Sequence, residues 1–288
     1  MEEVMLKRNS CIILFLLILS QFVAAKEKKE EKFGWNNTVV GSLNMTQVAF
    51  DNWAKGGENA ISWQVLISTI SERNHKKYKW ITTGKFNFGK TKLDDLDFRK
   101  SVDEFKLETV FTYKIGSYIN PYTAMTSLTQ VADGFKYLSE DEKVQVSAFL
   151  DPGYFTQSTG FGIEPTKGLK TRAGLSLKET ITSDFPKRFA DNPKTVKVEK
   201  VKTEVGFEST TDFSRKLSDN LVMTSKLEMF SNLEAFDEID VNWDNVFRAK
   251  VAKYISVNMN FHLLYDKTVS AKRQLNQSLA LGLTYTFI

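Results

Sequence analysis

The sequence is poor in the two residue types that most often carry chemistry. It has one cysteine, Cys11, and two histidines, His75 and His262, in 288 residues. Catalytic bases and metal ligands are most often histidine, and thiolate sites need cysteine. No serine signature of the G-x-S-x-G type is present. We therefore expect no enzyme activity, no metal site and no cofactor, and we interpret His262 as a histidine in a polar network.

Long hydrophobic runs are missing after the first 25 residues. The longest one, even counting glycine, is Leu279–Leu283, whereas a membrane-spanning helix needs roughly 20 apolar residues. The net charge of +4, with 26% charged residues, is too mild to indicate a nucleic-acid partner. Acidic clusters at 94–97 and 237–240 have the composition of solvated loops.

The N-terminus has the pattern of an export signal. Two basic residues precede the apolar core Cys11–Leu19, and small residues follow up to Ala25. This core is too short to span a membrane, so we predict a signal peptide over residues 1–25. A charged mobile leader over 26–37 and one barrel domain over 38–288 follow.

The strongest pattern in the rest of the chain is an alternation with a period of two. In Leu275–Phe287, large apolar residues alternate with small polar ones, which is typical of a strand between an apolar and a polar medium. The same pattern recurs at 78–88, 105–115, 169–178 and 257–265. Such segments are longer than the five or six residues usual in soluble proteins and match the roughly 9 to 11 of a tilted membrane strand.

Extending this reading along the chain predicts twelve strands. They lie at 38–50, 60–73, 77–89, 103–115, 118–130, 153–164, 169–182, 196–213, 220–234, 241–254, 256–266 and 274–287. The connections alternate between short and long, and Val131–Pro152 is the longest. An even strand number and this asymmetry are typical of outer-membrane barrels. We predict an all-β fold, a closed antiparallel transmembrane β-barrel of about 12 strands in a Gram-negative outer membrane.

Aromatic residues near the strand ends predict two belts at the bilayer interfaces. With a periplasmic N-terminus, the periplasmic belt contains Tyr78, Trp80, Phe111, Tyr113, Tyr285 and Phe287. The outer belt contains Phe88, Phe105, Trp243 and Tyr265.

The inward faces of the predicted strands carry an excess of basic residues. The basic set is Lys79, Lys85, Lys106, Lys114, Lys170, Arg172, Lys178, Lys200, Lys202, Lys226, Arg248 and Lys250. The opposing acidic set is Glu108, Glu204, Glu208, Glu228 and Asp244. Fixed positive charge in a narrow tube favours anions, whereas charges that pair across the lumen would seal it. A barrel of twelve strands is intermediate in size between small filled barrels and open porins. The strand number therefore does not decide whether the lumen is open or filled.

Several short motifs resemble a known family. Asn52–Asn59, Asp97–Asp103, the Val241–Trp243 strand opening and the ending Leu283–Phe287 resemble an uncharacterised outer-membrane barrel family, common in Bacteroidetes, of unknown function. The resemblance implies a barrel in the outer membrane and brings no activity. Such barrels usually end on an aromatic residue that the assembly machinery reads, whereas here Ile288 follows Phe287.

Three functions remain open at this stage. The leading one is a passive or weakly selective channel that passes small anionic solutes through a basic lumen. The second is a non-conducting structural or adhesive barrel with a plugged lumen and partner-binding outer loops. A membrane-embedded lipid enzyme is the third and has the least support, because no lipid-facing serine–histidine pair is predicted. The expected partners are the lipid bilayer, the assembly machinery and small solutes, with no nucleic acid.

Overall fold

The structure, a computed structural model, describes residues 33–50, 58–116, 118–139, 142–192, 195–266 and 272–287, without the side chains of 236–238. The predicted signal peptide, residues 26–32 of the leader and residues 52–57 of the Asn52–Asn59 motif lie outside this set. The first strand begins at Gly34, inside the predicted leader, because residues from Gly34 onward pair with the next strand.

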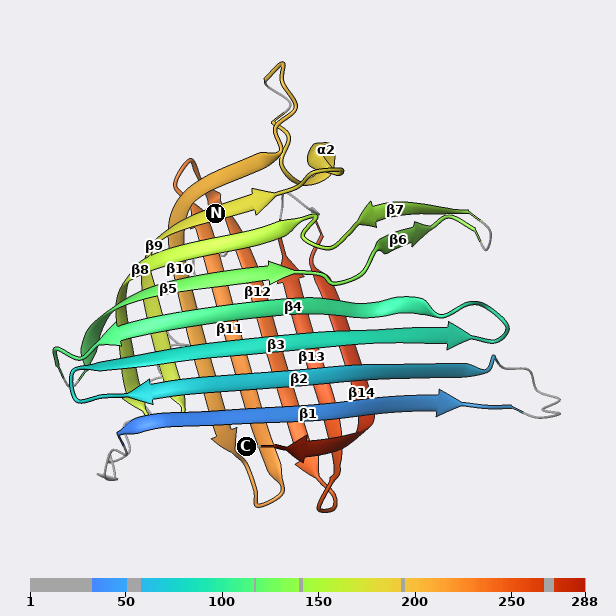
Figure 1. The fold of residues 1–288 in the computed structure, drawn as a ribbon, viewed down its shortest axis with the longest axis horizontal. Helices are drawn as coiled ribbons and strands as arrows, with labels where there is room; N and C mark the ends of the chain where they lie inside the picture. Colours follow the sequence, from blue (N-terminus) through green and yellow to red (C-terminus); the bar gives the residue numbers. More distant parts are fainter. Residues whose placement is uncertain are drawn as a thin grey trace, which may run out of the picture.

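Twelve strands close into one antiparallel barrel, in which β1 pairs with β14. They are β1 (Gly34–Val48), β2 (Ala60–Asn74), β3 (Tyr78–Leu93), β4 (Arg99–Tyr113), β5 (Ile119–Thr129), β8 (Gly153–Thr166), β9 (Leu169–Ile181), β10 (Val201–Lys216), β11 (Leu221–Asn232), β12 (Ala235–Lys250), β13 (Ile255–Tyr265) and β14 (Gln274–Thr286). The predicted closed antiparallel barrel of twelve strands is confirmed. In Figure 1, β1 to β4 cross the back strands β10 to β13 at a steep angle, as tilted strands of a closed barrel do.

The alternation along each strand places apolar side chains outside and polar ones inside. On β4, the outward-facing side chains of Phe105 and Leu107 are 40% and 45% exposed, whereas the inward-facing Glu108 is 5% exposed. Among the described residues, the buried hydrophobic ones are Tyr122, Ala124, Ala190 and Phe230, against fifteen buried polar or charged ones. Soluble globular proteins have the opposite distribution. The outer surface is therefore suited to an apolar medium.

The two rims of the barrel differ in their connections. At the turn rim the strands are joined by 75–77, 114–118, 167–168, 217–220 and 251–254, and at the loop rim by 49–59, 94–98, 130–152, 182–200, 233–234 and 266–273. Two predicted long connections, 90–102 and 235–240, are wrong. Both are mostly strand, continued past bulges at Gly89/Lys90 and Ser231/Asn232. These segments have the charged composition of loops because the strand ends extend beyond the apolar outer surface of the barrel.

The long connection between β5 and β8 is folded. It forms a two-stranded sheet of β6 (Gly134–Tyr137) and β7 (Lys143–Ser147), beyond the loop-rim end of β5 (Figure 1). The carboxylate of Asp103 anchors it, because it accepts the backbone N–H groups of Val131 at 2.8 Å and Ala132 at 2.9 Å. The connection after β9 carries the short helix α2 (Pro186–Phe189). Within the described residues, no helix has the length and apolar character to cross a membrane.

An arginine placed on the outer face tests its environment. Leu175, in the middle of β9, is 58% exposed and Leu217, in a turn-rim connection, is 47% exposed. Leu175→Arg should cost about 2–4 kcal/mol of unfolding free energy in phospholipid vesicles and Leu217→Arg about 0–1, because the cost of arginine depends on bilayer depth. Urea unfolding of the refolded variants measures both. Equal, small costs would mean that the face around Leu175 does not contact lipid.

Candidate functional site in the barrel lumen

Ion pairs cross the lumen between walls that are not neighbours in the barrel. Glu108 on β4 accepts Arg172 Nη2 of β9 at 2.7 Å through one carboxylate oxygen. Its other oxygen pairs with Nζ of Lys226 on β11. Glu108 therefore ties three strands together across the interior.

A second carboxylate repeats this arrangement beside the first. Glu228 on β11 contacts Nζ of Lys106 on β4 through both oxygens, at 2.6 and 2.7 Å. Its oxygen Oε2 also accepts Asn242 Nδ2 at 2.8 Å, and the Asn242 amide oxygen lies 2.7 Å from His262 Nε2. We call Lys106, Glu108, Arg172, Lys226 and Glu228 the mid-lumen cluster. Each of its charges has a counter-charge, which buried ions need to avoid a large desolvation cost.

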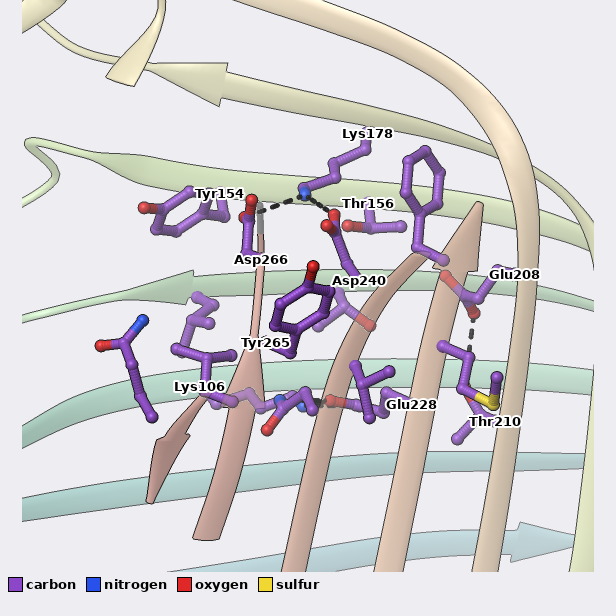
Figure 2. Close-up of a pocket in the computed structure, with 18 of the residues that line it drawn as sticks. Lys106, Tyr154, Thr156, Lys178, Glu208, Thr210, Glu228, Asp240, Tyr265 and Asp266 are labelled. Atoms are coloured by element: carbon purple, nitrogen blue, oxygen red, sulfur yellow. Dashed lines mark hydrogen bonds and ion pairs between the residues drawn. The ribbon is translucent and has the colours of Figure 1, made fainter. Parts of the chain in front are cut away.

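Two other basic residues form ion pairs outside the cluster. Lys178 Nζ lies 2.7 Å from Asp240 and 3.8 Å from Asp266, as Figure 2 shows. Lys85 lies 3.0 Å from Asp244 and 3.1 Å from Glu104.

Three more predicted lumen lysines have close polar partners. The distance from Nζ to the carboxylate oxygen is 3.1 Å for Lys79–Glu72 and 2.9 Å for Lys202–Glu204. Lys114 Nζ donates a hydrogen bond of 2.9 Å to Asn74 Oδ1. Lys170 lines a cavity, and Lys250 is exposed at the turn-rim end of β12.

The predicted excess of twelve basic over five acidic lumen residues is smaller in the structure. The structure adds acidic partners that the prediction did not count, namely Glu72, Glu104, Asp212, Asp240 and Asp266. Asp240 was missed because β12 begins earlier than predicted, and Glu72 because the register of β2 was weakly indicated. Most of the basic residues in the lumen are thus paired with a carboxylate.

Two cavities lie on either side of the mid-lumen cluster. The loop-side cavity, of about 270 Å³, is lined by Lys106 and Glu228 and, farther up, by Tyr154, Asp240 and Asp266 (Figure 2). The turn-side cavity, of about 390 Å³, is lined by Glu108 and Lys226 together with Glu72, Lys79, Lys114 and Lys170. Arg172 and Thr210 line both. The cluster therefore lies between the two spaces.

A third cavity, larger than these two, lies where the first and last strands meet. This seam cavity, of about 610 Å³, is lined mainly by amide and hydroxyl side chains of β1, β2, β3, β13 and β14. His262 and Arg248 are also part of its wall.

A row of hydrogen bonds crosses the wall of the seam cavity. Arg248 Nε donates to Asn258 at 3.1 Å, and Asn258 donates to Asn44 at 3.1 Å. Asn44 then donates to Gln64 at 2.8 Å, and Gln64 donates to Asn87 at 2.7 Å. We call these five residues the amide ladder. Each amide is both donor and acceptor, so the row satisfies polar groups that burial would otherwise leave unpaired.

The amide ladder was not predicted. Its members other than Arg248 are uncharged, and several lie on strands whose limits were weakly indicated by the sequence. The available signal was the repeated asparagine and glutamine on inward positions, which the count of charged residues passed over.

Most predicted belt residues lie on the outer face. Tyr78 stacks on Phe111 with ring centroids 5.5 Å apart, and Tyr285 contacts Phe287 at 4.9 Å near the turn rim. Trp80, Phe105, Tyr113 and Trp243 are between 40% and 46% exposed, and Phe88 contacts Trp63 at 5.9 Å. The placement of Tyr265 is wrong, because it lines the loop-side cavity (Figure 2). It ends β13 beside Asp266, where the regular alternation stops.

The described residues hold no group of three or more histidine, cysteine or acidic residues placed for a metal ion. His262 faces Asn242 in the polar network, and His75 stacks on Tyr78 in a turn with centroids 4.6 Å apart.

Removal of the central carboxylate tests the energetic role of the mid-lumen cluster. Glu108→Ala leaves Arg172 and Lys226 facing each other without their shared anion, and we expect a loss of about 3–5 kcal/mol in unfolding free energy. Asp219→Ala breaks the exposed Lys216–Asp219 pair, 2.9 Å long, and should cost less than about 1 kcal/mol. Urea titration followed by tryptophan fluorescence compares them. Similar costs for both would show that the cluster adds no stability.

The solved structures similar to this chain are barrels with low sequence identity. The translocator domain of autotransporter NalP from Neisseria meningitidis shares 11% identity at a TM-score of 0.40, covering 98% of this chain and 97% of that one. The COG4313 outer membrane channel from Pseudomonas putida F1 shares 9% at 0.41, covering 92% and 98%. The KdgM porin shares 11% at 0.32, covering 87% and 99%. The barrel assignment rests on the strand order of this chain and not on these similarities.

Sequence comparison identifies one family. No curated protein matches the chain. Residues 45–135, from the end of β1 to β6, match the model of a family described as "Protein of unknown function (DUF3078)". This segment contains two of the motifs on which the predicted resemblance was based, Asn52–Asn59 and Asp97–Asp103. Over residues 45–135 the chain is thus similar to an uncharacterised protein family.

Proposed function

We propose that this protein is an outer-membrane β-barrel whose lumen is closed to free ion flow by the mid-lumen cluster and holds small polar solutes in separate cavities. The membrane location is supported by the inverted distribution of side chains. Leu175, Phe207 and Leu279 on the outer face are 58%, 48% and 65% exposed, and apolar surface on this scale is unfavourable in water. Lipid would remove that cost.

The observation that carries the closed lumen is the bridging of β4 to β9 and β11 through Glu108. Side chains at ion-pair distance join these walls, so they obstruct the part of the lumen between β4, β9 and β11. The cavities above and below share Arg172 and Thr210 of their linings, and within the cluster three cations face two carboxylates at ion-pair distance. A solute crosses only if these side chains move.

The anion-selective channel predicted from the sequence needs unpaired positive charge in an open path. The mid-lumen cluster provides counter-charges for Lys106, Arg172 and Lys226 instead. The observations therefore support the second predicted function, a filled lumen, more than the first. Insertion through the assembly machinery by way of the C-terminal strand, and export by the signal peptide, are parts of this proposal.

Conductance in a planar bilayer tests the closed lumen. We expect the refolded wild-type protein to show no steady conductance steps in potassium chloride. The triple variant Glu108→Ser, Arg172→Ser, Lys226→Ser removes the bridging side chains without leaving a buried partner among the three, and should produce steps. The pair variant Glu72→Ser, Lys79→Ser removes a pair outside the cluster, with an N–O distance of 3.1 Å, and should stay silent.

Folding of all three proteins is checked by the shift of unheated protein on denaturing gels. Steady anion-selective steps from the folded wild-type protein would contradict the closed lumen and favour the predicted anion channel. A folded triple variant that stays silent would show that the cluster is not what closes the lumen.

A further inference from the structure

The barrel is closed along only part of the seam between its first and last strands. The pairing of β1 with β14 covers Val40–Met45 and Leu281–Thr286. The other side of β14 is paired with β13 from Leu283 back to Leu275 and Gln274, and β1 is paired with β2 as far as Val48. Within the described residues, the loop-rim half of β14, Gln274–Ala280, thus has no strand partner on β1.

The exposure of inward-facing residues changes at the same point. Ser42 and Asn44, in the paired half of β1, are 6% and 3% exposed. Thr46, Asn276 and Ser278 occupy inward positions in the unpaired half and are exposed. The polar interior is therefore accessible from the side of the barrel above Asn44.

The seam cavity extends along the unpaired part of β14. Its wall includes Asn276 and Ser278, which are on the inward face of that strand, and also the residues that follow them, Gln277 and Leu279. The seam cavity therefore lies against the part of the barrel wall where strand pairing with β1 is missing.

The closed half of the seam is fastened just below this opening. Asn258 Nδ2 donates a hydrogen bond to Asn44 Oδ1 across β14, over Gly282. A Cβ atom at this glycine would lie 2.2 Å from Asn44 Oδ1 and 2.8 Å from Asn258 Nδ2, so a side chain there would collide with both amides. Ser42 and Ser256 bond Thr284 at 3.0 and 2.9 Å. The paired half is thus held by side chains as well as by strand pairing, so the opening has a defined lower end.

We propose that this seam is a lateral portal for single-chain amphiphiles with an acidic head group, a carboxylate or a phosphate. The alkyl chain would lie outside against Leu275, Leu279 and Leu281, which are 61%, 65% and 57% exposed. The head group would enter the seam cavity, whose amides and hydroxyls supply hydrogen bonds. The inference rests on the membrane location proposed above and adds a ligand and a route to it.

Arg248 is the residue that selects an acidic head group. It lines the seam cavity, and its Nε donates to Asn258. Within the described part of the chain it forms no ion pair, unlike the arginine and lysines of the mid-lumen cluster. Its terminal nitrogens can therefore form paired hydrogen bonds with a carboxylate or phosphate.

Photo-crosslinking in vesicles tests the portal. The refolded protein is placed in phosphatidylcholine vesicles with a diazirine-labelled fatty acid, lysophosphatidic acid or phosphatidylcholine, and crosslinked peptides are mapped by mass spectrometry. We expect one or both acidic single-chain probes to label residues 46–48 and 274–280 in preference to the opposite wall around Leu175. The diacyl probe should label the outer surface evenly. The probe that labels the seam identifies the head group.

Arg248→Gln should reduce seam labelling by the acidic probes about tenfold, because one charge-assisted interaction is lost. Lys250→Gln, on the same strand and exposed at the turn rim, should leave it unchanged. Even labelling by every probe, or seam labelling that Arg248→Gln does not reduce, would overturn the proposal. Absence of labelling at 274–280 with every probe would also overturn it. Protein that fails to float with the vesicles would instead contradict the membrane location.

Discussion

Charge pairing across a polar interior is the constraint on which the rest of this barrel depends. Because the outer face is apolar, the usual hydrophobic core is replaced by side chains that must satisfy one another inside. Glu108 and Glu228 do so with cations from opposite walls. A charge left alone there would cost more than most single interactions contribute. Stability and closure of the lumen are thus two results of the same contacts.

The interior is divided into two chemically different regions. Between β4, β9 and β11 the contacts are ionic, and a cavity lies on either side. Along β1, β13 and β14 the contacts are amides and hydroxyls, and the seam cavity lies there. Neutral hydrogen bonds are weaker than charge-assisted ones. Separating β1 from β14 therefore breaks weaker side-chain contacts than separating the strands that carry the mid-lumen cluster. The incomplete pairing of β14 is at the same place.

The strands could be predicted because their signal is local. A period of two, repeated at membrane length, indicated the twelve strands and most of their faces, including Lys106 and Glu108 inside and Phe105 outside. The limits failed where charged residues continue a strand beyond the apolar band, as at 235–240. The hairpin of β6 and β7 also gave no clear signal, because it is held partly by Asp103 of a distant strand.

The pairing within the lumen could not be predicted in the same way. Which side chains meet across a barrel depends on strand tilt and stagger, and the sequence of one strand does not encode them. Lys226 and Glu108 are each evident as inward residues, yet their contact follows only from the closed structure. The predicted charge excess was too large for a different reason, because acidic residues such as Asp240 and Glu72 were not counted as inward residues.

A double-mutant cycle on Glu108 and Lys226 tests the central claim most directly. Unfolding free energies of Glu108→Gln, Lys226→Met and the double variant give the coupling between two walls that are not adjacent. The structure predicts a favourable coupling of about 1 kcal/mol or more, as found for residues in one network. Additive effects, within about 0.3–0.5 kcal/mol, would contradict a lumen closed by these contacts.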